Sequence, residues 1–324
     1  MADRGFFADK RVCVAGARGM VGAAIVRALE GMGAAVLPLG RDQADLRDQH
    51  AVRAWFAAHR PQLVFLAAAK VGGIVANDRY PADFLYDNLM IEANIIEAAH
   101  RHDVEKLLFL GSSCIYPKHA DQPMREDALL TGPLEPTNQW YAIAKIAGIK
   151  LAEAYRAQHG RNFISGMPTN LYGPGDNFDL TSSHVLPALA RKIVEARDTG
   201  AAEVPIWGTG TPLREFLHVD DCASACLYLM AHYDGAEHVN IGSGAEISIA
   251  DLARTIARIA GYHGRFVFDS SKPDGTPRKL MDSSQLHGLG WQPTISLDTG
   301  IAQVIDIIEQ SAGQLRTLDL AANR

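Results

Sequence analysis

Tyr141 and Lys145 lie four residues apart in the segment WYAIAK, a spacing that places both side chains on one face of a helix. An ammonium group beside a phenol stabilises the phenolate and lowers the pKa of the phenol from its ordinary value of about 10. Ser112 follows the apolar run LLFL and adds a hydroxyl at the expected end of a strand. Together the three side chains predict a site that holds a substrate oxygen and exchanges a proton with it while hydride moves to or from carbon.

A glycine turn predicts the partner of that chemistry. In GARGMVG, Gly16, Gly19 and Gly22 stand directly between a predicted strand, RVCVA, and a helix expected over about 20–32. Glycines permit a tight turn and close approach to a pyrophosphate, and the helix N-terminus offers unpaired N–H groups to the anion. Arg18 in the turn and Arg41 after the second strand favour the additional phosphate of NADP over the ribose of NAD. We therefore expect NADP(H) as the cofactor.

Short apolar runs alternate with longer helical patterns through the first half of the chain. Such runs indicate strands buried on both faces, hence a parallel sheet covered by helices. The expected fold class is α/β, a Rossmann-type doubly wound parallel sheet with a smaller C-terminal α/β substrate lobe, because the sequence becomes rich in Gly and Pro from about residue 171. The expected NADP-binding domain is 1–170, with 215–243 returning to it, and the substrate lobe comprises 171–214 and 244–324. Helices are expected near 48–59, 82–102 and 139–158.

Composition narrows the class of protein. A net charge of −6 argues against a general nucleic-acid binder, and the charged N-terminus and the absence of a long apolar run predict a cytoplasmic protein without a membrane span. The four cysteines show no metal-type spacing, so neither a metal site nor disulfides are expected. Cys222 and Cys226 are expected on the core face of a helix and Cys13 in a buried strand. Cys114, two residues after Ser112, is the cysteine whose position suggests chemistry.

These motifs resemble the short-chain dehydrogenase/reductase superfamily, in its extended branch that acts on nucleotide sugars. PTNLYGP (168–174) and REFLHVDD (214–221) resemble motifs of that branch. Within it, LGSSCIYPK, YAIAKIAGIK and KPDGTPRK are similar to the members that epimerise C3 and C5 of GDP-4-keto-6-deoxy-D-mannose and reduce C4 with NADPH, giving GDP-L-fucose. The similarity runs from about residue 10 to 298. It implies an oxidoreductase with epimerase activity.

The resemblance also implies that Cys114 and His184 exchange the protons at C3 and C5, which the C4 ketone makes acidic. From the residues alone, SSHVLP reads as a helix start with Ser183 as N-cap, so that the positive helix end favours a neutral imidazole at His184. A thiolate at Cys114 near a cation is equally able to act as a base. Which of the two is the acid and which the base stays open.

The remaining expected site residues bind ligands. Arg214 is suited to gripping a diphosphate and Trp207 to packing against a sugar or base; the resemblance implies a substrate role for both and for Lys192 and Asp274. The HVDD segment is expected to cap a helix through Asp220 or Asp221. The full set expected to contact the cofactor is Gly16, Arg18, Gly19, Met20, Val21, Gly22, Arg41, Ala67, Ala68, Leu110, Gly111, Ser112, Tyr141, Lys145, Pro168, Asn170, Leu171 and His184.

Two alternatives are kept. One is a nucleotide-sugar 4,6-dehydratase or 4-epimerase of the same fold, although dehydratases of this branch typically carry an Asp-Glu pair where this chain has Cys114, and a 4-epimerase leaves Cys114 and His184 unexplained. The other is a non-catalytic NADP-sensing regulator, for which the proton-donor set has no use. Beyond the GDP-sugar substrate, the expected partner is a second copy of the chain. The resemblance implies pairing through the helices near 82–102 and 139–158.

Overall fold

The computed structural model describes residues 4–180, 182–272, 274–311 and 315. Its centre is a parallel sheet of six strands in the order β2-β1-β3-β4-β5-β9. The strands are β1 (Arg11–Ala15), β2 (Ala35–Leu39), β3 (Leu63–Leu66), β4 (Lys106–Leu110), β5 (Asn162–Pro168) and β9 (Val239–Ile241). Every residue of β3 and β4 is buried, which is why these strands read as continuous apolar runs. The expected doubly wound fold is confirmed.

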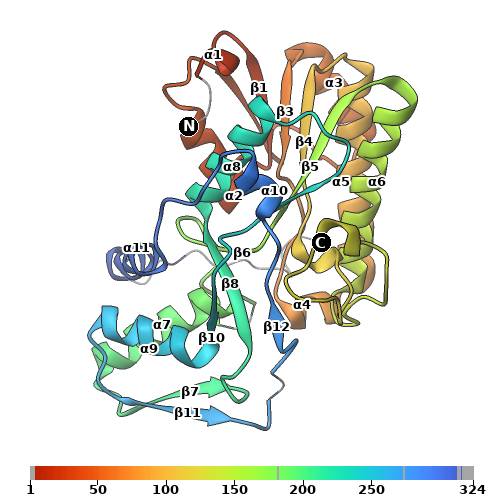
Figure 1. Ribbon diagram of the computed structural model, residues 1–324. Helices are drawn as coiled ribbons and strands as arrows, with labels where there is room; N and C mark the ends of the chain where they lie inside the picture. The colour runs from red at the N-terminus through yellow and green to blue at the C-terminus, as the bar shows by residue number, and fades with distance from the viewer. Residues whose placement is uncertain (1–3, 181, 273, 312–314, 316–324) are drawn as a thin grey trace.

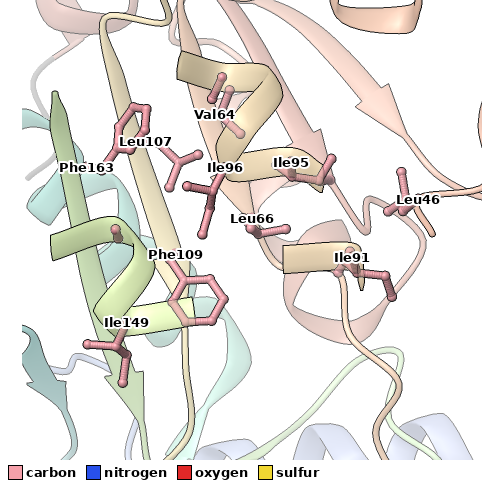
Figure 2. Packing of buried hydrophobic residues seen from close by; sticks show 14 of the residues in the cluster. Leu46, Val64, Leu66, Ile91, Ile95, Ile96, Leu107, Phe109, Ile149 and Phe163 are labelled. Carbon is pink, nitrogen blue, oxygen red and sulfur yellow. The ribbon is translucent and has the colours of Figure 1, made fainter. Parts of the chain in front are cut away.

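Helices cover both faces of this sheet (Figure 1). One face carries α2 (Met20–Leu29) and α8 (Val219–His232), with the short α1 (Arg4–Phe7) contributing Phe7 to the same core. The other carries α3 (Gln49–His59), α5 (Pro81–Arg101) and α6 (Gln139–His159). On that side Phe109 and Phe163 of the strands and Ile95 and Ile149 of the helices belong to one buried cluster (Figure 2). The helices expected near 48–59, 82–102 and 139–158 are thus present within a residue or two.

The smaller lobe is built on β8 (Leu213–His218), which pairs with β10 (Glu246–Ser248), β12 (Arg278–Lys279) and β6 (Asn170–Tyr172). A two-stranded sheet joins β7 (Glu203–Trp207) to β11 (Arg265–Asp269). Three helices, α7 (Val185–Thr199), α9 (Ile249–Ala260) and α11 (Leu297–Gln310), bury their apolar faces in this lobe's own core.

The chain crosses between the lobes more than once. β8 lies in the small sheet, and the return to the large sheet begins with α8 at Val219 and continues into β9. A second return follows at α10 (Ser284–Gly288), because Leu286 and Trp291 are buried in the core beneath α2 and α8. The short elements α4 (Ile74–Arg79), η1 (Ser113–Ile115) and η2 (Glu126–Ala128) lie in the connections. The division at residues 171, 215 and 244 stays a prediction.

Two structural expectations for cysteine are confirmed. Cys13 lies in β1, and Cys222 and Cys226 lie on the buried side of α8, all three without measurable exposure. The HVDD segment caps α8 as expected, but the capping residue is His218 and neither aspartate: its ring accepts the N–H of Asp220 at 3.2 Å, whereas Asp221 accepts the N–H groups of Thr294 and Ile295. The carboxylate therefore fastens the segment after α10 instead of capping its own helix.

Candidate active site

Ser112 and Cys114 are placed by a turn at the end of β4. Ser112 follows the strand in extended conformation, and η1 turns the chain back so that Cys114 N–H faces the Ser112 hydroxyl at 3.4 Å. Cys114 is buried, with 8% of its surface exposed. Burial raises the pKa of its thiol, and the charges of Lys279 and Lys145 and a hydrogen bond from Ser112 oppose that effect. The positive charges of two lysines therefore act on the thiol that the sequence singled out by position.

Lys145 joins α6 to the end of the same strand. Its ammonium donates a hydrogen bond to the Leu110 carbonyl at 3.0 Å and lies 5.7 Å from the centre of the Tyr141 ring. Lys145 is 2% exposed, so this placement is fixed by the surrounding core. The structure thus brings together Ser112, Tyr141 and Lys145, as the sequence predicts.

The electrostatic environment of Tyr141 differs from the prediction. Burial raises the pKa of its hydroxyl well above the ordinary value, and negative charge on Cys114 and Glu92 raises it further. Lys145 does not overcome these effects because Glu92 of α5 lies 2.9 Å from its ammonium and offsets its charge. Tyr141 is accordingly a protonated phenol, suited to donating a proton. Glu92 was missed in the sequence, where a glutamate among the apolar residues of NLMIEANII was the available signal.

His184 stands directly before α7, in the smaller lobe. It is itself the N-cap residue, and its side chain makes no capping hydrogen bond, so the predicted cap at Ser183 is wrong by one residue. The imidazole keeps access to solvent, while the atoms packed around it and the charge of Lys279 lower its pKa. A neutral His184 at neutral pH agrees with the expectation from the helix end.

Lys279 is the second residue that sequence reasoning missed. It ends β12 and is the register partner of Arg214 on β8, so both cations leave the small sheet side by side. The charge of Lys279 favours the thiolate of Cys114 and lowers the pKa of His184, so one cation acts on both of these side chains. It forms no ion pair within the described ranges of the chain. Its signal was the last residue of KPDGTPRK.

The predicted substrate residues gather around β7 and β8. Trp207 is 55% exposed, and the ammonium groups of Lys192 and Lys272 lie 5.5 Å and 5.8 Å from its ring. Burial lowers the pKa values of Lys192 and Arg214, and the negative charge of Asp274 opposes that effect at Arg214. The region therefore presents an aromatic face with positive charge, which suits a base or sugar followed by phosphates.

Asp274 has a structural task of its own. Its carboxylate accepts hydrogen bonds from the Thr209 N–H at 2.6 Å and the Thr209 hydroxyl at 2.9 Å, which holds the turn after β7. Gly208 in that turn has φ +77°, and a Cβ there would meet the Asp274 carboxylate. A role for Asp274 toward substrate stays a prediction.

The glycine turn forms a cradle that fits a dinucleotide. Gly16 has φ +86°, and a Cβ there would lie 2.7 Å from the backbone of Ala68, while a Cβ at Gly22 would lie 2.1 Å from the Gly16 carbonyl oxygen. Gly19 is the N-cap of α2 and supplies no side-chain cap, so the first N–H groups of the helix are left for an anion. These residues fit the pyrophosphate of NADP.

The other expected cofactor residues border this cradle. Met20 and Val21 form the first turn of α2, Ala67 follows β3, and Leu110 and Gly111 end β4. Arg18 forms an ion pair with Asp42 at 2.5 Å, and most of its side chain is exposed. The role of Arg18 and Arg41 as ligands of the additional phosphate stays a prediction. Pro168 ends β5. Leu171 lies in β6 with Asn170, whose amide donates to the Glu215 carbonyl.

Within the described residues, no helix is long and apolar enough to span a bilayer, and no group of His, Cys, Asp and Glu side chains could hold a metal ion.

Comparison with known proteins places these residues in context. The NAD dependent epimerase/dehydratase family matches residues 12–242. The chain is 59% identical to a GDP-L-fucose synthase of Sinorhizobium fredii, over 91% of this chain and 94% of that protein. It is also 59% identical to the GDP-L-fucose synthase of Escherichia coli, over 90% and 94%. Among solved structures, a GDP-L-fucose synthetase from Naegleria fowleri bound to NADP has a TM-score of 0.87 and 29% identity, covering 96% of this chain and 97% of that one.

Proposed function

The chain belongs to the NAD dependent epimerase/dehydratase family, and from that premise we propose that it is a GDP-L-fucose synthase. The reaction converts GDP-4-keto-6-deoxy-D-mannose to GDP-L-fucose by epimerisation at C3 and C5 and reduction at C4. NADPH, when bound, supplies the hydride to C4. The observation that carries the proposal is the placement of Cys114 beside Ser112 and Lys279, because reduction alone needs no proton carrier at the neighbouring carbons.

Ser112 and Tyr141 serve the substrate oxygen at C4. Removing a proton from C3 or C5 moves negative charge onto that oxygen, and so does hydride addition, so one pair of donors assists each step. The buried Lys145 holds α6 against the end of β4 through the Leu110 carbonyl and thereby fixes Tyr141 relative to Ser112. Tyr141 supplies its proton to the C4 oxygen in the final step. Its raised pKa keeps the phenol protonated until negative charge develops on that oxygen.

Cys114 and His184 carry the protons at C3 and C5. Lys279 favours the thiolate of Cys114 and disfavours a protonated His184, so it biases the pair toward a state that can accept a proton. A proton taken from one face of the sugar ring and returned to the other inverts the carbon. The two residues lie on different lobes, which suits the approach of one acid and one base from two sides.

Substrate recognition falls to the small lobe. Arg214 grips the diphosphate of the GDP-sugar, and Trp207 packs against the nucleotide or sugar with Lys192 beside it. The large lobe, residues 1–170 with the segment that returns as α8 and β9, binds the cofactor. The two binding roles correspond to the two predicted domains. The chain returns to the large lobe at Val219, where α8 begins.

The assembly we propose is a cytoplasmic homodimer paired through α5 and α6. Tyr86 on α5 is 61% exposed, and Trp140 and Ile143 on α6 are each 39% exposed. Large apolar side chains in solvent on neighbouring helices are typical of an interface between copies. Light scattering after size exclusion tests this, and a monomer at micromolar concentration would contradict it.

The decisive experiment combines turnover with isotope exchange. The protein is mixed with NADPH and GDP-4-keto-6-deoxy-D-mannose in deuterated water, and NADPH oxidation and label at C3 and C5 are followed. The proposal expects GDP-L-fucose labelled at both carbons, and Cys114→Ser is expected to lose 10²- to 10⁴-fold in exchange, roughly the contribution of one proton carrier. Reduction without exchange would leave a plain ketoreductase, and NADPH binding without turnover would favour another nucleotide sugar or a sensor.

A further inference from the structure

Glu92 is a carboxylate on α5 buried beside the lysine of the active site. It is 1% exposed, and its Oε1 lies 2.9 Å from the Lys145 ammonium in an ion pair, while neither oxygen receives a hydrogen bond of good geometry from the described part of the chain. Gly148 on α6 leaves room for it, since a Cβ at 148 would lie 2.7 Å from Oε2 and 2.5 Å from the Phe109 ring. The packing therefore accommodates a buried carboxylate at this point, held by its ion pair with Lys145.

The charged neighbours of Glu92 come from one element. Lys145 on α6 is the charged group that acts on it; β4 faces it with the uncharged ring of Phe109, and Asn88, one turn earlier on α5, is neutral. The ring of Tyr141 lies near the Lys145 ammonium, and negative charge on Glu92 and on Cys114 of η1 raises the pKa of its hydroxyl. Burial raises the pKa of Glu92 to about 7, and Lys145 opposes that rise. Near neutrality the Glu92–Lys145 pair therefore changes between no net charge and one positive charge.

We propose that Glu92 is a positioning residue that sets the pH range in which Tyr141 acts as proton donor, by cancelling the Lys145 charge when it is ionised. This inference rests on the proposed reduction at C4. With Glu92 ionised, the pKa of Tyr141 stays high, so the phenol keeps its proton until negative charge develops on the substrate oxygen. With the negative charge of Glu92 removed, the uncompensated Lys145 stabilises the phenolate and lowers the pKa of Tyr141. The protonated phenol that serves as donor is then lost at a lower pH.

Glu92→Gln removes the charge with little change of shape, and Glu97→Gln is the matched control. Glu97 lies on the same helix but pairs outward with Arg53 and Arg101. In Glu92→Gln, the alkaline limb of the kcat/KM profile for NADPH oxidation is expected to move to lower pH by about one unit. In Glu97→Gln it is expected to stay. Identical limbs in wild type and Glu92→Gln, with only a lower Tm in the variant, would reduce Glu92 to a packing residue and overturn the inference.

A second measurement uses the cofactor-free wild type, so it does not depend on activity or on the folding of Glu92→Gln. Carbon-13 NMR of the glutamate carboxyls follows Glu92, with Glu92→Asp providing the assignment. The inference expects a midpoint near 7, accompanied by a shift of the Tyr141 ring carbon that bears the hydroxyl; a midpoint near the ordinary 4.5 overturns it. If the wild type fails to turn over substrate, the proposed function fails, and this titration still decides the coupling of Glu92 to Tyr141.

Discussion

Replacing Lys279 by methionine tests how the active-site thiol is controlled. Lys279 is the strongest of the influences that lower the pKa of Cys114 against its burial. An opposite charge in such a position shifts a pKa by about 1–3 units, and each unit corresponds to about 1.4 kcal/mol and a tenfold change in the thiolate population. Lys279→Met is therefore expected to slow proton exchange at C3 and C5 by at least about tenfold at pH 7, if the thiolate is the base.

The assay is deuterium incorporation by NMR at saturating substrate, measured across pH. Because the loss arises from a raised thiol pKa, the rate in Lys279→Met should recover when the pH is raised by the same number of units. Lys150→Met, at an exposed pair with Glu153, is the control and should follow the wild-type profile. A profile of Lys279→Met that superimposes on wild type would refute the reasoning. A loss that no increase in pH restores would instead assign Lys279 to holding substrate.

Three further outcomes follow from other parts of the structure. Gly22→Ala should abolish measurable NADPH binding by fluorescence while leaving a folded protein, because its Cβ would overlap the Gly16 carbonyl; unchanged binding would contradict the cradle. Trp207→Ala should raise KM for the GDP-sugar about tenfold with little change in kcat or in unfolding, since an exposed aromatic contact contributes roughly 1–1.5 kcal/mol. His238 is 3% exposed, and burial lowers its pKa to about 4. Its contribution is present above the ordinary pKa of 6.5 and is lost as pH falls toward 4, a fall of about 3 kcal/mol in unfolding free energy that urea titrations of His238→Gln should lack.

The parts of the site that lie within one motif could be predicted from the sequence. Tyr141 and Lys145 share a helix face by spacing, Ser112 and Cys114 follow one strand, and the glycine turn joins a strand to a helix. Local periodicity and turn chemistry are enough for these, and they also indicate the sheet, because β3 and β4 are buried throughout and read as unbroken apolar runs.

The electrostatic interactions between residues of different motifs could not be predicted from local patterns. Glu92 reaches Lys145 only because α5 packs against α6, and Lys279 reaches Cys114 only because β12 is aligned on β8 after a long separation in sequence. The expected lowering of the pKa of Tyr141 was wrong for the same reason, since it considered Lys145 without burial and without Glu92. The cap of α7 was misplaced by one residue because Ser183 and His184 are both acceptable before a helix.

The two-residue strand β12 has a consequence for the order in which the enzyme becomes complete. The expected cofactor residues end at His184 and the large sheet is complete with β9 at Ile241, yet the Lys279 cation that acts on Cys114 arrives only when β12 adds to β8. A chain that ends before residue 278 would retain Gly16, Ser112, Tyr141 and Lys145 while lacking the charge that poises the thiol. During synthesis on the ribosome, the capacity to hold NADP would therefore precede the capacity to epimerise, and proton exchange at C3 and C5 would be among the last properties the protein acquires.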